Sequence, residues 1–196
     1  MKKFLTAKHW QLFVLLIGLP VICQFILMGV MFSSLSGLSS RETMPDIRPF
    51  FIIFPIMMIL VIVVFFGWFY SLGTNLFKML PDTAGMSLTR FKVFLIIPVI
   101  YIVFICVFMY GFAPAMFVLG QSDPRIFLLI IPIHIFSMFC IFYCLYFNAK
   151  VLKTVELQRP VTFSDYAGEF FLLWFFPVGV WIIQPRINRL FDSTAS

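Results

Sequence analysis

Four long apolar stretches organise the chain, and they contain no Asp, Glu, Lys or Arg. A bilayer core about 30 Å thick is crossed by about 20 apolar residues in a helix. Each stretch is long enough, so the pattern predicts transmembrane helices at residues 12–32, 50–70, 93–119 and 126–147. The chain is therefore predicted to be an all-α integral membrane protein, with residues 1–196 forming a single membrane domain.

A fifth hydrophobic segment, at residues 166–183, differs from the four spans. It is shorter, carries Glu169 near its start, and is interrupted by Pro177 and Gly179. Irregular backbone at membrane depth is tolerated only where protein or water covers it. We therefore predict a re-entrant or interfacial segment that turns back near Pro177, with Trp181 as an interfacial anchor. A complete fifth span is the alternative.

The spacing of the prolines predicts an internal repeat. Residues 19–22 (LPVI) recur as residues 97–100 (IPVI), and Pro55 of the second span corresponds to Pro132 of the fourth. Nearly constant spacing of this kind is typical of duplicated units. The pattern predicts two tandem parallel hairpin repeats, with a partial third copy around Pro177. Chance recurrence of proline in Phe- and Ile-rich sequence is the alternative.

The basic residues predict the orientation. With residues 1–11 and the tail at 184–196 in the cytoplasm, eleven of the 14 Lys and Arg residues lie inside. The three that lie outside are Arg41, Arg48 and Arg125. Because cytoplasmic loops are enriched in Lys and Arg, this asymmetry predicts cytoplasmic N- and C-termini. We expect the protein in a bacterial inner membrane.

The amino-acid composition also indicates that most of the chain lies in lipid. Hydrophobic residues make up 62% of the sequence, against about 45–50% in soluble globular proteins. The formal net charge of +6 falls on the predicted cytoplasmic face, which favours anionic lipid headgroups over direct contact with nucleic acid. Trp68 and other Trp and Tyr residues near that face predict an aromatic belt. The basic residues expected to face lipid or a protein partner there are Lys78, Arg90, Lys92, Lys150, Lys153, Arg159, Arg186 and Arg189.

Polar side chains within the hydrophobic segments are the candidate functional groups, because ionisable residues in a membrane are costly. They are Gln24, His134 and Glu169. Hydrogen bonding between helices is the more ordinary role for Gln24 and His134. The sequence carries no HExxH, GxSxG or paired acids, and it offers no nucleophile–base pair or phosphate-binding glycine loop. We therefore predict no catalytic residues, no metal and no cofactor, and the four cysteines are expected to be packing residues.

Three stretches carry a resemblance to a known group of proteins. They are residues 71–76 (SLGTNL), 162–165 (TFSD) and 175–188 (FFPVGVWIIQPRIN). In these stretches the chain resembles a group of small multi-pass bacterial inner-membrane proteins of unassigned function. Its size and layout, though no motif, are also similar to membrane accessory proteins found beside some RNA-guided defence nucleases.

The sequence favours a non-enzymatic membrane protein that acts by assembly. Uncharged spans and short loops leave no room for a catalytic domain, so we expect a homo-oligomer or an accessory component bound to a membrane or cytoplasmic protein. The alternative is a small channel or pore, for example an accessory or effector of a phage-defence system. Without a ring of charges, such a pore would be lined by hydrophobic side chains and would gate by dewetting.

Overall fold

The structure is a computed structural model that describes residues 3–36, 48–81, 85–112 and 124–192. The described residues form helices joined by turns. Their bounds are α1 (Lys3–Thr6), α2 (His9–Phe13), the π-helix η1 (Val14–Gly18), α3 (Leu19–Ser36), α4 (Arg48–Phe77), α5 (Leu88–Gly111), α7 (Pro124–Leu157), α8 (Phe163–Trp174) and α9 (Phe176–Asp192).

Four of the helical segments are long and apolar enough to cross a membrane, which confirms that part of the prediction. They are His9–Ser33, which runs through α2, η1 and α3, then Pro49–Phe77, Leu88–Gly111 and Leu128–Leu157. The helices do not end where the predicted spans end. Helix α4 continues to Phe77 and α7 to Leu157, because polar residues at a helix end can leave the hydrocarbon without breaking the helix. Helix α5 ends at Gly111, and residues 113–119 of the predicted third span lie outside the described residues.

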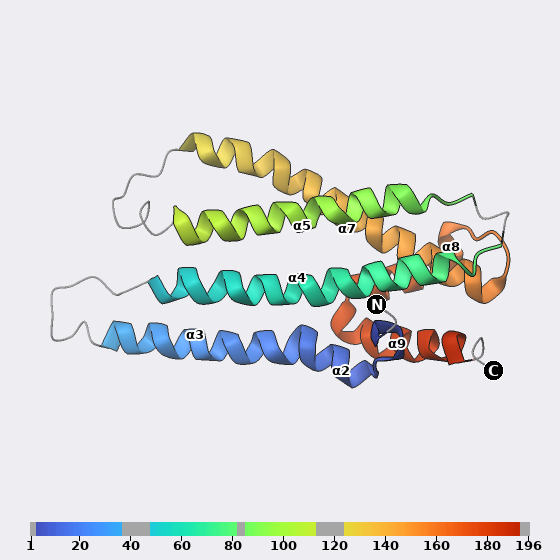
Figure 1. The fold of residues 1–196 in the computed structure, drawn as a ribbon, viewed down its shortest axis with the longest axis horizontal. Helices are drawn as coiled ribbons and strands as arrows, with labels where there is room; N and C mark the ends of the chain where they lie inside the picture. The colour runs from blue at the N-terminus through green and yellow to red at the C-terminus, as the bar shows by residue number, and fades with distance from the viewer. Residues whose placement is uncertain (1–2, 37–47, 82–84, 113–123, 193–196) are drawn as a thin grey trace.

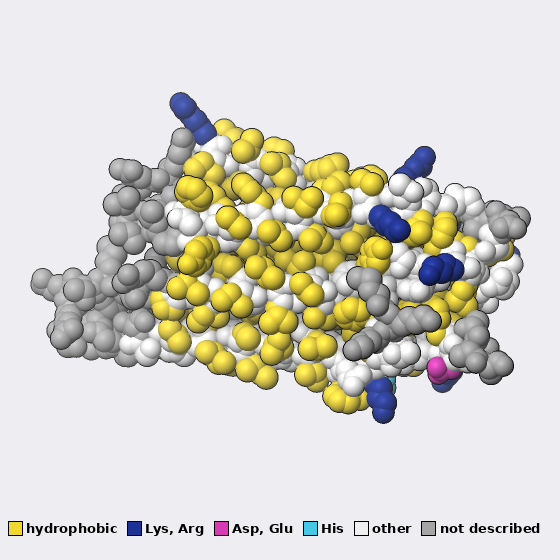
Figure 2. Space-filling view, in the orientation of Figure 1, with side chains coloured by type: hydrophobic (Ala, Val, Ile, Leu, Met, Phe, Trp, Pro, Cys, Tyr) yellow, Lys and Arg dark blue, Asp and Glu magenta, His cyan; other side chains and the backbone are white. Residues whose placement is uncertain are grey.

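The four spans lie side by side as two antiparallel pairs (Figure 1). Helices α3 and α4 form one pair, α5 and α7 form the other, and α4 packs against α5 where the pairs meet. The short helices α1, α8 and α9 gather at one end (Figure 1). Figure 2 shows hydrophobic side chains over the long section and most of the visible Lys and Arg toward the end that holds α8 and α9.

Pro20 differs from Pro55, Pro98 and Pro132 in its local backbone. Pro20 lies two residues after the end of the π-helical segment η1. Proline has no N–H to donate and its ring crowds the preceding turn, which is a physical reason for the wider turn there. Pro98, its counterpart in the predicted repeat, lies inside continuous α-helix, as do Pro55 and Pro132. The internal repeat stays a prediction.

The fifth hydrophobic segment is a helical hairpin. The chain breaks at Phe175 (φ −86°, ψ 56°), between α8 and α9, and the two helices pack on each other. Pro177 stands in the first turn of α9, a position where proline is tolerated, so the turn precedes the point we expected. Gly179 permits this turn, because a Cβ there would lie 1.7 Å from the carbonyl oxygen of Leu172. The segment is not among the described helices that could cross a membrane.

The best-packed part of the core lies toward the end that holds α8 and α9. The ring of Phe91 stacks on Phe147 with centroids 4.3 Å apart, and a Cβ on Gly73 would lie 2.6 Å from the Phe91 ring. The absence of a side chain at Gly73 therefore lets α4, α5 and α7 approach closely. Trp68 is 1% exposed, so its assignment to the aromatic belt is wrong.

Candidate functional site

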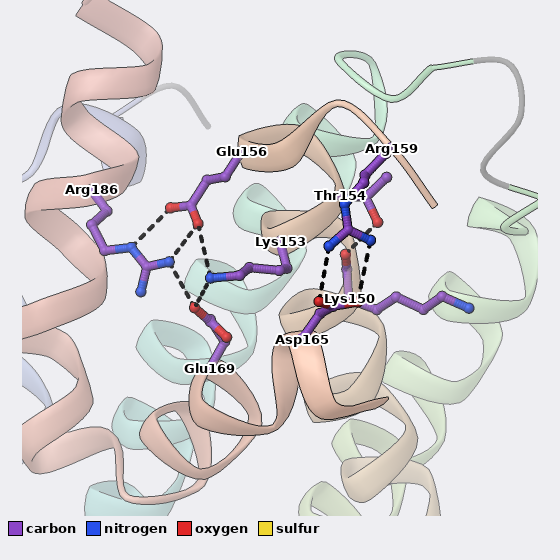
Figure 3. Close-up of polar contacts among 8 residues, drawn as sticks. All are labelled: Lys150, Lys153, Thr154, Glu156, Arg159, Asp165, Glu169 and Arg186. Atoms are coloured by element: carbon purple, nitrogen blue, oxygen red, sulfur yellow. Dashed lines mark hydrogen bonds and ion pairs between the residues drawn. The ribbon is translucent and has the colours of Figure 1, made fainter. Parts of the chain in front are cut away.

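Four charged side chains form a cluster, here named the ionic cluster, where α7, α8 and α9 meet. Lys153 and Glu156 come from the last turns of α7, Glu169 from α8 and Arg186 from α9 (Figure 3). Lys153 and Glu156 are three residues apart and so lie on one face of α7. Helices α8 and α9 each add one residue to this pair. The cluster holds two positive and two negative charges and is formally neutral.

Arg186 is the centre of the ionic cluster. Its Nε donates to Glu156 Oε1 at 2.8 Å, and its Nη2 donates both to Glu156 Oε2 and to Glu169 Oε1, the latter at 2.7 Å (Figure 3). Lys153 Nζ completes the cluster with a contact of 3.1 Å to Glu169 Oε1. The bidentate pairing with Glu156 uses the fixed fork of the guanidinium, a geometry that lysine cannot supply.

Glu169 is 5% exposed and depends on these partners to remain charged. Burial alone would raise the pKa of its carboxyl, but hydrogen bonds from Arg186 and Lys153 outweigh burial and hold the pKa below its ordinary value. Hydrogen bonding to Glu156 likewise raises the pKa of the Arg186 guanidinium. A carboxylate kept ionised in this way is suited to holding helices together rather than to donating a proton at neutral pH.

The start of α8 is fixed by a second ion pair beside the cluster. Asp165 Oδ2 accepts a hydrogen bond of 2.8 Å from the backbone N–H of Thr162, the N-cap residue. Its Oδ1 accepts one of 3.0 Å from Arg159 (Figure 3). These contacts, with the backbone contribution largest, lower the pKa of Asp165 to about 2. The carboxylate therefore caps the helix and also complements its positive N-terminal dipole.

Gln184 joins the N-terminus to α9 and α4. Its side-chain N–H group lies 3.0 Å from the carbonyl oxygen of Phe4 and 3.1 Å from that of Ala7. These are backbone oxygens at the end of α1, which have no partner within the helix. Its Oε1 accepts a hydrogen bond of 3.0 Å from the indole N–H of Trp68. Gln184 is fully buried, so its polar atoms are paired rather than left to solvent.

The candidate polar residues of the spans occupy different surroundings. His134 is exposed on α7, and its Nδ1 lies 3.1 Å from the hydroxyl of Tyr101 on α5, so it makes the interhelical contact expected of it. Gln24 is exposed on α3, and no described residue hydrogen-bonds to its side chain. Glu169 is buried in the ionic cluster. The three residues do not form one site.

The eight basic residues divide into two groups. Lys78, Arg90, Lys92 and Arg189 are exposed and face outward. The other four contact groups within the chain: Lys153 and Arg186 in the ionic cluster, Arg159 with Asp165, and Lys150 with the Tyr146 hydroxyl at 3.2 Å. The four exposed residues are therefore the ones whose charges are available to a lipid headgroup or a protein partner.

Sequence reasoning missed Glu156, Gln184 and Tyr101. A signal for Gln184 was present, because Val180, Ile183, Gln184 and Ile187 recur at helical spacing and so share one face. Across residues 3–36, 48–81, 85–112 and 124–192, no three His, Cys, Asp or Glu side chains are grouped to hold a metal ion.

Comparisons with known proteins identify no relative. No family model matches the chain, no curated protein matches it, and no solved structure matches its fold. What is established is a chain with four candidate membrane-spanning helices, which indicates a multi-pass membrane protein.

Proposed function

We propose that the protein is a non-enzymatic component of a bacterial inner membrane that acts by assembling with further copies of itself or with a membrane partner. The observation that carries the proposal is the placement of Gln24 and His134. Both side chains lie on the outer surface of apolar spans rather than in the core. A polar group facing hydrocarbon without a partner costs free energy, and a neighbouring helix can supply the missing hydrogen bonds.

The surroundings of these residues support an intermolecular contact. Among the four spans, the one that contains α3 is the least buried, with 11% of its apolar stretch buried against 22–28% in the others. Helix α3 lies at the edge of the bundle next to α4 alone (Figure 1). At the opposite edge, the His134 ring uses Nδ1 for Tyr101, which leaves Nε2 for a group outside the chain.

The test is the mass of the protein in a mild detergent and in lipid nanodiscs. We expect multiples of the 22.8 kDa chain, or a stable complex with a co-purifying membrane protein. Gln24→Leu and His134→Leu should each shift the population toward monomer, whereas Ile26→Leu, an exposed apolar exchange on α3, should not. A strict monomer without any co-purifying protein would overturn the proposal.

The same preparations test the pore alternative. Toward the end that holds α8 and α9, the space between α4, α5 and α7 is filled by packed side chains such as Phe91, Phe147 and Leu72. A channel would therefore form between copies rather than through one chain. Ion or dye flux from proteoliposomes that contain the purified oligomer would favour the pore alternative. If no flux is observed, the assembly proposal stands without a pore.

A further inference from the structure

An apolar groove of about 440 Å³ lies between α4 and α5. We name it the α4–α5 groove, and it is lined by Ile62, Val63, Phe66, Gly67, Tyr70, Lys92, Leu95, Ile96 and Val99. The two helices run antiparallel, so Tyr70 and Lys92 stand at one end, and Ile62 and Val99 stand at the other. At 1.5 Å per residue, the stretch from Ile62 to Tyr70 makes the groove about 12 Å long.

The end marked by Lys92 differs chemically from the rest of the groove. Lys92 is exposed, and its Nζ lies 5.9 Å from the centroid of the Tyr70 ring. No residue that lines the groove is acidic, and the ion pairs among the described residues do not involve Lys92. Lys92 and Tyr70 are thus the polar residues at one end of an otherwise apolar groove.

We propose that the α4–α5 groove holds one acyl chain of an anionic phospholipid, whose phosphate binds Lys92. The hydrocarbon chain would cover Val63 and Ile96, which are 64% and 54% exposed, and the Lys92 ammonium supplies the charge complementary to the phosphate. Lys92 lies at the end of the bundle that carries α8 and α9, where the exposed basic residues gather. This lipid site does not depend on the assembly proposed above.

The site can be tested by photolabelling the full chain in proteoliposomes. Phosphatidylglycerol and phosphatidylcholine analogues, each with a photoreactive group on one acyl chain, are crosslinked in parallel, and the labelled peptides are mapped by mass spectrometry. We expect phosphatidylglycerol to label residues 62–70 and 92–99 several-fold more than phosphatidylcholine does. Equal labelling by the two lipids, or labelling spread evenly over the four spans, would overturn the proposal.

Three variants separate the headgroup contact from the groove itself. Lys92→Gln should lower the phosphatidylglycerol excess by about fivefold, the effect of one basic residue near a membrane surface, while Lys92→Arg should retain it. Lys78→Gln removes an exposed charge that does not line the groove, so it should lower the phosphatidylglycerol excess at residues 62–70 and 92–99 by less than Lys92→Gln does. Ile96→Trp fills the groove and should abolish labelling there by both lipids. Retained labelling in Ile96→Trp, or equal effects of Lys92→Gln and Lys78→Gln, would contradict the assignment.

Discussion

At the scale of single residues, Arg186 joins α9 to α8 and to the end of α7 through its contacts with Glu169 and Glu156. Arg186→Gln would leave two carboxylates facing Lys153 alone. Hydrogen bonds between charged groups contribute about 1.5–3 kcal/mol each in proteins, so we expect a loss of about 2 kcal/mol in the local stability of α8 and α9. That loss corresponds to roughly 30-fold faster amide hydrogen exchange in the two helices.

Arg189→Gln is the matched control for this prediction, because it removes the same charge from an exposed position one turn further along α9. Its exchange should match that of the unsubstituted protein. If the two variants behave alike, the loss of net charge is responsible, and the ionic cluster does not stabilise the hairpin.

The second prediction at this scale concerns Gly179. A Cβ at this position would lie 1.7 Å from the Leu172 carbonyl oxygen, a backbone atom that cannot rotate away. Gly179→Ala should therefore force α8 and α9 apart and destabilise the hairpin by about 3 kcal/mol or more, as strong overpacking does. Proteolysis at the α8–α9 turn should become faster.

Gly168→Ala provides the comparison. A Cβ at Gly168 meets nothing within 4 Å, so alanine should stabilise α8 by about 0.5–1 kcal/mol through helix propensity. Unchanged proteolysis in Gly179→Ala would show that the two helices can separate without cost.

Sequence reasoning identified some of these residues but not their partners. The rarity of charge in the hydrophobic segments marked Glu169 as unusual. Its pairing with Arg186 depends on the turn at Phe175, and the sequence placed that turn two residues later. The helical spacing of Gln184 with its apolar neighbours could have shown that it is buried, but not that it binds the backbone carbonyls of Phe4 and Ala7, because no side-chain pattern reports a backbone acceptor 180 residues away.

At the scale of elements, helix α8 is held by two ionised carboxylates, and this makes its stability sensitive to acid. The pKa of Asp165 is lowered from 3.8 to about 2, and that of Glu169 is also lowered from its ordinary 4.5. A lowered pKa stabilises the fold above the ordinary value, and the stabilisation is lost as pH falls toward the folded-state pKa. Helix α8 should therefore keep full protection at pH 5 and above and lose protection below about pH 4.

Hydrogen exchange can measure this, with protection factors corrected for the intrinsic effect of pH. Helix α5 contains no Asp or Glu and serves as the internal reference. Constant protection of α8 down to pH 2, or a parallel loss in α5, would contradict the assignment of the acid sensitivity to Asp165 and Glu169.

The four long helices show that hydrophobic patterning is sufficient to predict the membrane spans. Four uncharged stretches predicted four long helices, because backbone groups in hydrocarbon must be satisfied within a helix. The same pattern did not give the position of the turn within residues 166–183. That position depends on the close contact of Gly179 with Leu172 and on the pairing of Arg186 with the end of α7, and both are tertiary contacts.

At the scale of the whole molecule, the chain has two chemically different ends, and this asymmetry predicts how it inserts. Lys78 and Arg189 are exposed toward the end that holds α8 and α9, while Arg125 stands at the start of α7 at the opposite end. Moving the more basic end across the membrane is disfavoured, so that end should face the cytoplasm. Cysteines introduced at these positions should therefore react with a membrane-impermeant maleimide from opposite sides.

In intact spheroplasts, we expect Arg125→Cys to be labelled and both Lys78→Cys and Arg189→Cys to be protected, with the order reversed in inside-out vesicles. The unsubstituted protein is the background control. Cys106, Cys140 and Cys144 are buried, and Cys23 lies within the span that contains α3, away from the water that the reagent needs. Labelling of Lys78→Cys in intact spheroplasts would reverse the orientation, since Lys78 directly follows α4 and Arg125 lies at the start of α7, and these two candidate membrane spans fix which end lies on which side.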